Sequence, residues 1–204
     1  MHTEVKTTDT LNTIKSLLGE NNGILRTENA IRAGISRVTL SSLVKGGKLE
    51  RISHGRYILP GDMPDELYLI QQRSVIVVFS HETALYLHDM AERTPHQYSL
   101  TIPSTRKLSP VLSEACKIFY VKPELYELGK CIVPSKMGHE IISYDPERTI
   151  CDILRSRNRI DNQTFAAALK NYATYKNQDW NKLRSYAEAF QVTKLLRQYL
   201  EVLL

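Results

Sequence analysis

The chain has 204 residues, of which 27 are Lys or Arg and 22 are Asp or Glu, for a formal net charge of +5. The hydrophobic fraction of 42% excludes a disordered chain and allows one large or two ordinary domains. The longest apolar run, residues 75–79, is far too short to span a bilayer, and the first four residues do not begin a signal peptide. We therefore expect a cytoplasmic protein that does not enter the membrane.

Two helices are predicted before residue 34. Residues 8–18 carry apolar side chains at helical spacing, and Gly19 follows them. Thr27 opens a second, short helix with Glu28 in its first turn, where a carboxylate suits the helix dipole. Gly34 then suits the tight turn between two helices of a helix-turn-helix unit.

A third helix is predicted after Ser36, whose hydroxyl can cap its first free amides. Leu40, Leu43 and Val44 fall at i, i+3 and i+4 and define its buried face. The outward face carries Val38, Ser41, Ser42 and Lys45, with Arg37 and Thr39 on the flanks of the first turn. This face is small, polar and basic, as a recognition helix requires, because bulky side chains would hold it away from the base edges of the major groove. Gly46-Gly47 ends the helix.

A β-hairpin is predicted directly after this helix. Short runs of β-formers surround Ser53-His54-Gly55, a span whose glycine permits a hairpin turn. Arg51, His54 and Arg56 cluster at this tip, where cations could neutralise backbone phosphates. The alternative is a solvated hairpin with ordinary surface arginines. Helix, helix, recognition helix and wing together predict a winged helix-turn-helix DNA-binding domain over residues 1–60.

The charge distribution agrees with this assignment. Residues 1–60 hold nine Lys or Arg against five Asp or Glu, a balance of +4, whereas residues 61–145 hold eight against eleven, a balance of −3. Residues 146–204 hold ten against six, which indicates either a second basic surface or the solvated face of a helical tail. The amino-terminal domain is therefore expected to contact nucleic acid.

A second domain over residues 61–204 is predicted from the breaks at Pro60-Gly61 and Pro64. Residues 75–79 fit either a buried strand or part of a buried helix, and Ser80 is expected to cap a helix that runs to Met90. The other expected elements are a helix at 67–73, strands at 98–102, 117–121, 131–133 and 139–143, a helix from Pro146, and helices at 165–175, 179–190 and 192–204. The predicted fold class is α+β, with an α/β domain that ends in a helical segment. Leucines 195, 196, 200, 203 and 204 form either a dimerising stripe or the core-facing side of the last helix.

No catalytic, metal or cofactor site is predicted. His81-Glu82 resembles the start of an HExxH zinc motif, but Leu85 occupies the position of its second histidine. Asp145, Glu147 and Asp152 form an acidic group that a helix start at Pro146 explains. Three cysteines (116, 131 and 151) have neither CxxC spacing nor an even count, so we expect buried thiols and not a disulfide framework or a zinc ribbon.

The chain resembles the AbiEi family, antitoxins of type IV toxin–antitoxin systems that act in abortive infection, a form of phage defence. The amino-terminal part matches the family at Gly34-Ile35-Ser36, Thr39-Leu40, Leu43-Val44-Lys45, Gly47-Lys48-Leu49 and Gly55-Arg56-Tyr57, and the second part at 80–85, 145–149 and 151–154. This resemblance covers nearly the whole chain. It implies a repressor of its own operon that counteracts a nucleotidyltransferase-like toxin without requiring a stable complex, and it implies no enzyme.

Two alternatives remain at this point. The chain could be a winged-helix regulator whose second domain senses a small ligand, or an enzyme that carries a DNA-binding module. A dimer on the inverted repeats of its own promoter is expected, because one winged helix reads only a short stretch of DNA. In the second domain, Lys136 and Arg148 are expected to be exposed cations that an anionic or RNA-like partner could use, or else plain surface residues.

Overall fold

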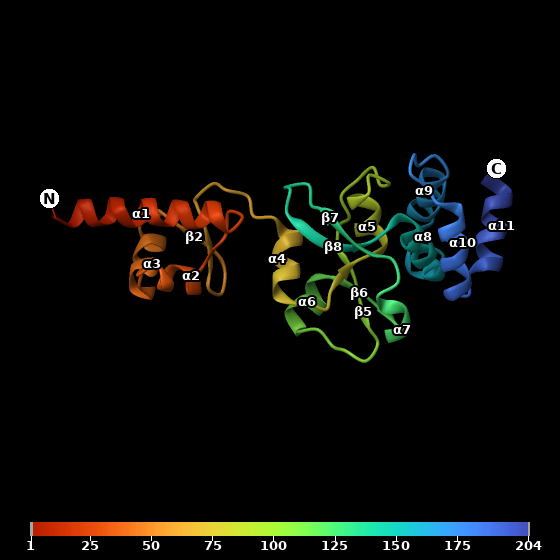
Figure 1. Ribbon diagram of the computed structural model, residues 1–204, viewed down its shortest axis with the longest axis horizontal. Helices are drawn as coiled ribbons and strands as arrows, with labels where there is room; N and C mark the ends of the chain where they lie inside the picture. Colours follow the sequence, from red (N-terminus) through yellow and green to blue (C-terminus); the bar gives the residue numbers. More distant parts are fainter. Residues whose placement is uncertain (1, 204) are drawn as a thin grey trace. The chain divides into compact units, whose positions relative to one another are not determined.

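The computed structural model describes residues 2–203, with side chains described for residues 9–199. The chain divides into two compact units, Met1–Glu66 and Leu67–Leu204 (Figure 1). Helices and strands are both present, and the fold class is α+β, as predicted. Among the described residues, no helix combines the length and the apolar character that crossing a bilayer requires.

The first unit contains three helices and a small sheet. Its elements are α1 (His2–Glu20), β1 (Leu25–Arg26), α2 (Thr27–Arg32), α3 (Arg37–Lys45), β2 (Glu50–Ser53) and β3 (Arg56–Ile58). The three predicted helices and the hairpin are present, although α1 extends beyond residues 8–18 at both ends. Strand β1 was not predicted, because two residues carry no periodicity; it pairs antiparallel with β3, so the strand order is β1-β3-β2.

One apolar core holds the first unit together. Ile14 of α1, Leu25 of β1, Ala30 of α2 and Leu40 of α3 have no exposed surface. These side chains come from successive elements, so burying them fixes α3 against the other two helices. The face of α3 opposite Leu40 is left for solvent.

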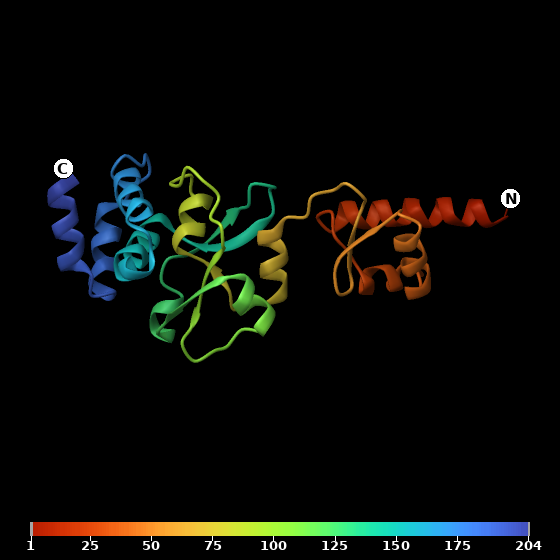
Figure 2. The ribbon, with the colours of Figure 1, turned by 180° about the vertical axis from the view of Figure 1, so that it is seen from behind.

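The second unit is built on a five-stranded mixed sheet with the strand order β6-β5-β4-β8-β7. Its strands are β4 (Val78–Phe79), β5 (Ser99–Pro103), β6 (Lys117–Val121), β7 (Lys130–Pro134) and β8 (Glu140–Tyr144). Its helices are α4 (Glu66–Arg73), α5 (His81–Leu87), α6 (Pro110–Ala115), α7 (Pro123–Tyr126), α8 (Pro146–Arg155), α9 (Asn162–Ala173), α10 (Trp180–Ala189) and α11 (Thr193–Leu203), with a 3-10 turn at Arg157–Arg159. Figure 2 shows from behind that α8 to α11, in cyan and blue, gather at one end of this unit.

Successive side chains of β5 point to opposite faces of the sheet, and the two faces have different surroundings. Leu100 and Ile102 are fully buried in the cluster that includes Leu67 of α4. The intervening Ser99 and Thr101 point instead to the start of α5, where Thr101 Oγ1 donates to Ser80 Oγ at 2.7 Å. The period of two that predicts a strand therefore also separates an apolar face from a hydrogen-bonded one.

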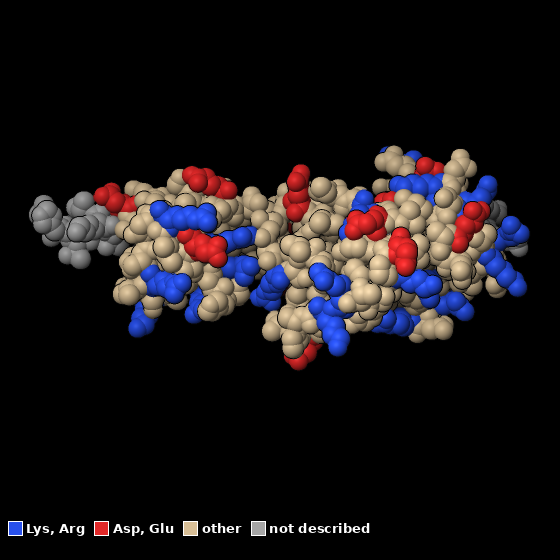
Figure 3. Space-filling view, turned by 60° about the horizontal axis from the view of Figure 1, so that its bottom comes forward, with Lys and Arg blue, Asp and Glu red and all other residues tan. Residues whose placement is uncertain are grey.

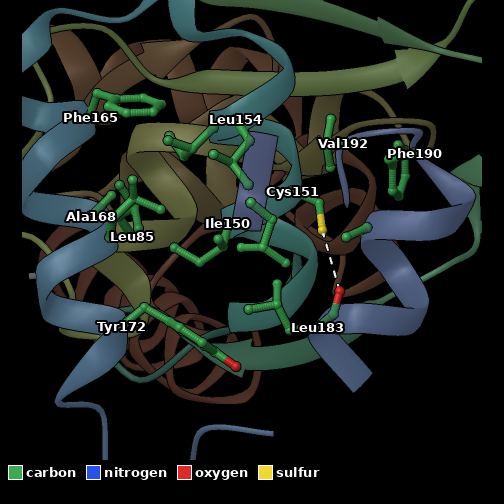
Figure 4. Close-up of a cluster of buried hydrophobic side chains, with 14 of the residues drawn as sticks. Leu85, Ile150, Cys151, Leu154, Phe165, Ala168, Tyr172, Leu183, Phe190 and Val192 are labelled. Carbon is green, nitrogen blue, oxygen red and sulfur yellow. Dashed lines mark hydrogen bonds between the residues drawn. The ribbon is translucent and has the colours of Figure 1, made fainter. Parts of the chain in front are cut away.

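A second cluster surrounds α8 (Figure 4). Ile150, Ile153 and Leu154 have no exposed surface, which confirms the predicted buried face, and Cys151 on the same helix is also fully buried. Helices α5, α9 and α10 pack against α8, so it is buried on all sides instead of along one stripe.

Three details of the second unit differ from the prediction. Only Val78–Phe79 of residues 75–79 forms a strand, and Val75 is 88% exposed. Helix α5 ends at Leu87 and not at Met90, because Asp89 adopts a positive φ of 57° and Met90 N donates back to Leu85 O. Ser80 occupies the N-cap position of α5, but its hydroxyl bonds to other side chains and does not cap the helix.

The predicted leucine stripe at the end of the chain is only partly described. Leu196 is buried in the α8 cluster and Leu195 is half-buried against it, so these two leucines face the core. The side chains of Leu200, Leu203 and Leu204 lie outside the described residues.

Candidate nucleic-acid interface

Helix α3 exposes the small polar face that the sequence predicts. Ser36 is its N-cap, and Ser36 Oγ accepts a hydrogen bond from Thr39 N at 3.1 Å. Leu40 and Leu43 are buried, whereas Val38 is 79% exposed. The predicted residues of α3 that are exposed are Arg37, Val38, Ser41, Ser42 and Lys45. The helix thus presents hydroxyls, one aliphatic side chain and two cations to solvent.

Thr39 has a local structural task. It is half-buried, and its hydroxyl lies 2.9 Å from Ser36 Oγ, so it takes part in the cap at the start of α3. A hydroxyl that is hydrogen-bonded within the cap is less available to a base edge than those of Ser41 and Ser42. Contacts of all these residues with DNA stay predictions.

The hairpin of β2 and β3, residues 50–58, is the predicted wing, and its tip is held against the start of α2. Thr27 N donates to Gly55 O at 2.9 Å, and Gly55 has a positive φ of 68°. A Cβ at Gly55 would lie 3.2 Å from Thr27 Oγ1, so glycine meets both the conformation and the close approach. Arg51 folds along the turn, where its Nε donates to Ser53 O at 3.3 Å and its Nη2 lies 3.2 Å from His54 Nδ1. The tip is therefore fixed in place by hydrogen bonds.

A groove of about 410 Å³ lies between the wing and the starts of α2 and α3. It brings together four residues of the predicted site, Arg37, Arg51, His54 and Arg56. Arg26 and Glu28 also line it, and Arg26 lies opposite Arg56 in the β1–β3 register. Lys and Arg side chains are prominent on the amino-terminal unit in Figure 3.

Sequence reasoning missed Arg26. The only signal for it was its position directly before Thr27 in the basic amino-terminal part of the chain, because β1 is too short to show a strand pattern. Val38, Ser41, Ser42 and Lys45 do not line the groove. The predicted site therefore separates into an outward helix face and an arginine-lined groove.

The second unit corrects one prediction. Arg148 is not an exposed cation: its side chain is fully buried, and its Nε donates to Asp152 Oδ2 at 3.0 Å. Its Nη1 donates to Leu125 O at 2.7 Å and also to Leu128 O, and its guanidinium lies over the ring of Tyr144 at 3.9 Å. The prediction was wrong because spacing cannot distinguish a cation on a solvated helix face from one that α7 and the following loop cover.

Lys136 is exposed, as predicted, but it is engaged. Its Nζ forms an ion pair with Asp89 and lies 5.3 Å from the centre of the Tyr86 ring. An exposed pair of this kind contributes little to stability. The role of Lys136 toward a partner stays a prediction.

His81 is part of a buried hydrogen-bonded network. Its Nδ1 lies 2.9 Å from Ser80 Oγ, its Nε2 lies 3.0 Å from Ser156 Oγ, and its ring stacks on Phe119. Burial, reinforced by Arg155 and Lys117, lowers the pKa of His81 well below its usual range. Among the described residues, no group of three or more His, Cys, Asp or Glu could hold a metal ion.

The cysteines are thiols in apolar surroundings. Cys116 and Cys151 are buried and Cys131 is half-buried. Burial raises the pKa of the Cys131 thiol to about 11 and also raises the pKa of the other two. All three are therefore protonated near neutral pH and are poor nucleophiles.

The neutral state of His81 predicts a pH-dependent stability. The pKa of His81 in the folded state is lower than the unfolded value of about 6.5. The contribution of neutral His81 to the free energy of unfolding is therefore complete above that pH and is lost as the pH falls below it. Burial lowers the pKa of His88 as well. Each histidine adds a slope of up to about 1.4 kcal/mol per pH unit to the free energy of unfolding.

We expect His81→Asn to remove one such slope between pH 5 and pH 6. Asparagine tolerates the positive φ of 49° at this position and does not titrate. Urea unfolding followed by Trp180 fluorescence measures the effect in the second unit. His96→Asn, at an exposed position, is the matched control. If the free energy of unfolding of His81→Asn depended on pH as steeply as that of the wild type, His81 would not be the buried neutral group that we infer.

The first unit therefore contains three helices, of which the third is capped and has an open polar face, and a hairpin that follows it. Residues 12–60 match the family model described as "Transcriptional regulator, AbiEi antitoxin". This match lies within the first unit and agrees with the sequence motifs there that resemble the AbiEi antitoxin family.

Solved structures share the fold. The RV2827C protein from Mycobacterium tuberculosis is similar with a TM-score of 0.64 at 13% sequence identity, over 90% of this chain and 74% of that one. At this identity the similarity shows the fold alone. A comparison with curated proteins finds no match.

Proposed function

We propose that this protein is a DNA-binding antitoxin of a type IV, abortive-infection toxin–antitoxin system that serves in phage defence. It binds inverted repeats in its own promoter as a dimer, represses its operon in the cytoplasm, and counteracts a nucleotidyltransferase-like toxin without a required stable complex. It acts without catalysis or a cofactor. The observation that carries the proposal is the open, small and basic face of α3 within the segment that matches AbiEi transcriptional regulators.

The geometry of α3 supports major-groove readout. Val38, Ser41 and Ser42 are short and exposed, so the helix axis can approach the base edges closely. Lys45 in the last turn can reach a phosphate, which fixes the register of the helix without reading sequence. Two copies are needed, because one helix reads only a few base pairs, and pairing half-sites raises specificity.

The promoter should show two protected half-sites in a footprint. Lys45→Ala or Arg56→Ala is expected to weaken binding to specific and random DNA alike, and to flatten the slope of log affinity against log salt by about 0.9 for each lost phosphate contact. Lys15→Ala is the matched control, since Lys15 is an exposed lysine on α1, outside the proposed face. Unchanged slopes in both variants would remove these residues from the interface.

Residues that read bases should behave differently from residues that contact phosphates. Ser42→Ala or Val38→Ala is expected to lower affinity for the operator by about 1–3 kcal/mol where a good base contact is lost, and to spare binding to random DNA. Equal losses on both DNAs would contradict this orientation of α3.

The antitoxin activity is assigned to residues 61–204, and it should separate from DNA binding by mutation. The triple variant Arg37→Ala, Lys45→Ala and Arg56→Ala is expected to lose operator binding, yet to rescue the growth of cells that produce the toxin from an unrelated promoter. The folded state of the variant is checked by circular dichroism. A folded triple variant that fails to rescue would show that protection is transcriptional.

A further inference from the structure

The groove beside α3 carries a concentrated positive charge. Four arginines, Arg26, Arg37, Arg51 and Arg56, and one glutamate, Glu28, are its charged lining residues, which gives a formal charge of +3. These arginines come from three different elements: β1, α3 and the wing. Charges that converge from separate elements on one concave surface create a strong local potential for an anion.

The groove is also preorganised. The wing tip is fixed through Thr27 and Gly55, and Arg51 is oriented by hydrogen bonds to Ser53 O and His54. Arg26 and Arg56 lie opposite each other across paired strands, so the sheet brings both side chains to the same groove. A site whose backbone is already fixed loses little entropy on binding.

The position of the groove indicates which anion it binds. When α3 enters a major groove, the phosphate strand along its edge passes between α3 and the wing. The groove occupies this interval, with Arg37 on the side of α3 and Arg51 and Arg56 on the side of the wing. Guanidinium groups bind phosphate oxygens in bidentate geometry, which favours Arg over Lys at such a site.

We propose that this groove holds one backbone phosphate of the DNA strand that passes between α3 and the wing, and that Arg26 of β1 contacts it. This inference rests on the proposed operator binding. It adds a residue from outside the recognition helix and the hairpin to the interface. It also gives the wing a second task, because its tip forms one wall of the phosphate site.

The test combines a protein variant with a modified operator. Individual phosphates at the edge of one half-site are replaced by uncharged methylphosphonates, and affinity is measured by fluorescence anisotropy. Wild-type protein is expected to lose about tenfold in affinity at one position, as expected for a charge-assisted contact. Arg26→Ala is expected to bind the unmodified operator about tenfold more weakly, and to be insensitive to the methylphosphonate at that same position.

Arg32→Ala is the matched control, because Arg32 is exposed on α2 and does not line the groove. It should keep wild-type sensitivity at every phosphate. Arg37→Ala provides a second test at an exposed position, where folding is not at risk, and it should share the insensitivity of Arg26→Ala. If Arg26→Ala and Arg37→Ala keep the full methylphosphonate effect, the phosphate does not lie in this groove. Absence of operator binding by the wild-type protein would instead refute the proposed function itself.

Discussion

Replacing Gly129 with alanine is expected to destabilise the second unit by about 2–5 kcal/mol, the sum of a left-handed backbone cost of about 1–2 kcal/mol and an overpacking cost of about 1–3 kcal/mol. Gly129 has a φ of 79°, and an added Cβ would lie 2.5 Å from Arg148 Cβ. Arg148 Cβ belongs to a fully buried side chain on α8, so it cannot move aside cheaply. Gly129 O also accepts a hydrogen bond from Asp145 N, the N-cap residue of α8, so any shift of the loop disturbs the start of that helix.

Gly138→Ala is the matched control. Gly138 has a φ of 86°, but an added Cβ there meets nothing within 4 Å. It should therefore show the backbone cost alone, about 1–2 kcal/mol. Urea unfolding followed by Trp180 fluorescence compares the two variants. Equal destabilisation of both would mean that the loop at Gly129 relaxes and that the close approach to α8 has no energetic weight.

The sequence predicted the local structure of the first unit well where nearby residues decide it. Ser36 caps α3, and Leu40 and Leu43 are buried, because capping and helical periodicity depend only on residues a few positions apart. The hairpin followed from its glycine and its β-formers for the same reason. All three of these signals are local.

The sequence predicted poorly where distant segments meet. The groove exists because β1 pairs with β3 and Thr27 bonds to Gly55, contacts between residues about thirty positions apart that leave no periodic trace. Arg26 was therefore missed. Helices α6 and α7 were missed because they are short and begin at prolines, which indicate a break and a helix start equally well.

Arg148 and Lys136 show the same limit in the second unit. Both were predicted to be exposed cations near a family motif, and only Lys136 is exposed. The aromatic ring and the two carbonyls that receive Arg148 come from β8, α7 and the loop after α7, so burial of this residue is decided by tertiary packing. The sequence of α8, in which charged and apolar residues alternate, does not show that its charged residues are buried as well.

Arg148→Met is expected to destabilise the second unit by about 3–5 kcal/mol, because it leaves a buried carboxylate without its main partner. Asp152 keeps only Arg155, whose Nη2 lies 3.3 Å from Asp152 Oδ1. The carbonyls of Leu125 and Leu128 also lose their donor. Lys136→Met is the control, and the loss of its exposed pair with Asp89 should change the free energy of unfolding by no more than about 1 kcal/mol.

The difference in free energy of unfolding between wild type and Arg148→Met should depend on pH, and this dependence gives a sharper test. Burial raises the pKa of the Asp152 carboxyl, against the opposing effect of Arg148 and Arg155. Without Arg148 this pKa rises further, so the variant protonates Asp152 more readily as the pH falls and loses the cost of a buried unpaired charge. The deficit of Arg148→Met relative to wild type is therefore expected to be smaller at pH 5 than at pH 7.5. A deficit that does not change with pH would show that Asp152 is not the source of the instability.

The same variant also tests whether Arg148 has any direct part in antitoxicity. A fully buried guanidinium cannot touch a toxin or an RNA, so Arg148→Met should affect growth rescue only through the amount of folded protein. At a temperature where the variant remains folded, it should rescue cells as well as wild type does, and rescue should fail as the unit unfolds. Loss of rescue by a folded Arg148→Met protein would require that α8 opens when the antitoxin acts, and the buried ion pair would then belong to the functional surface.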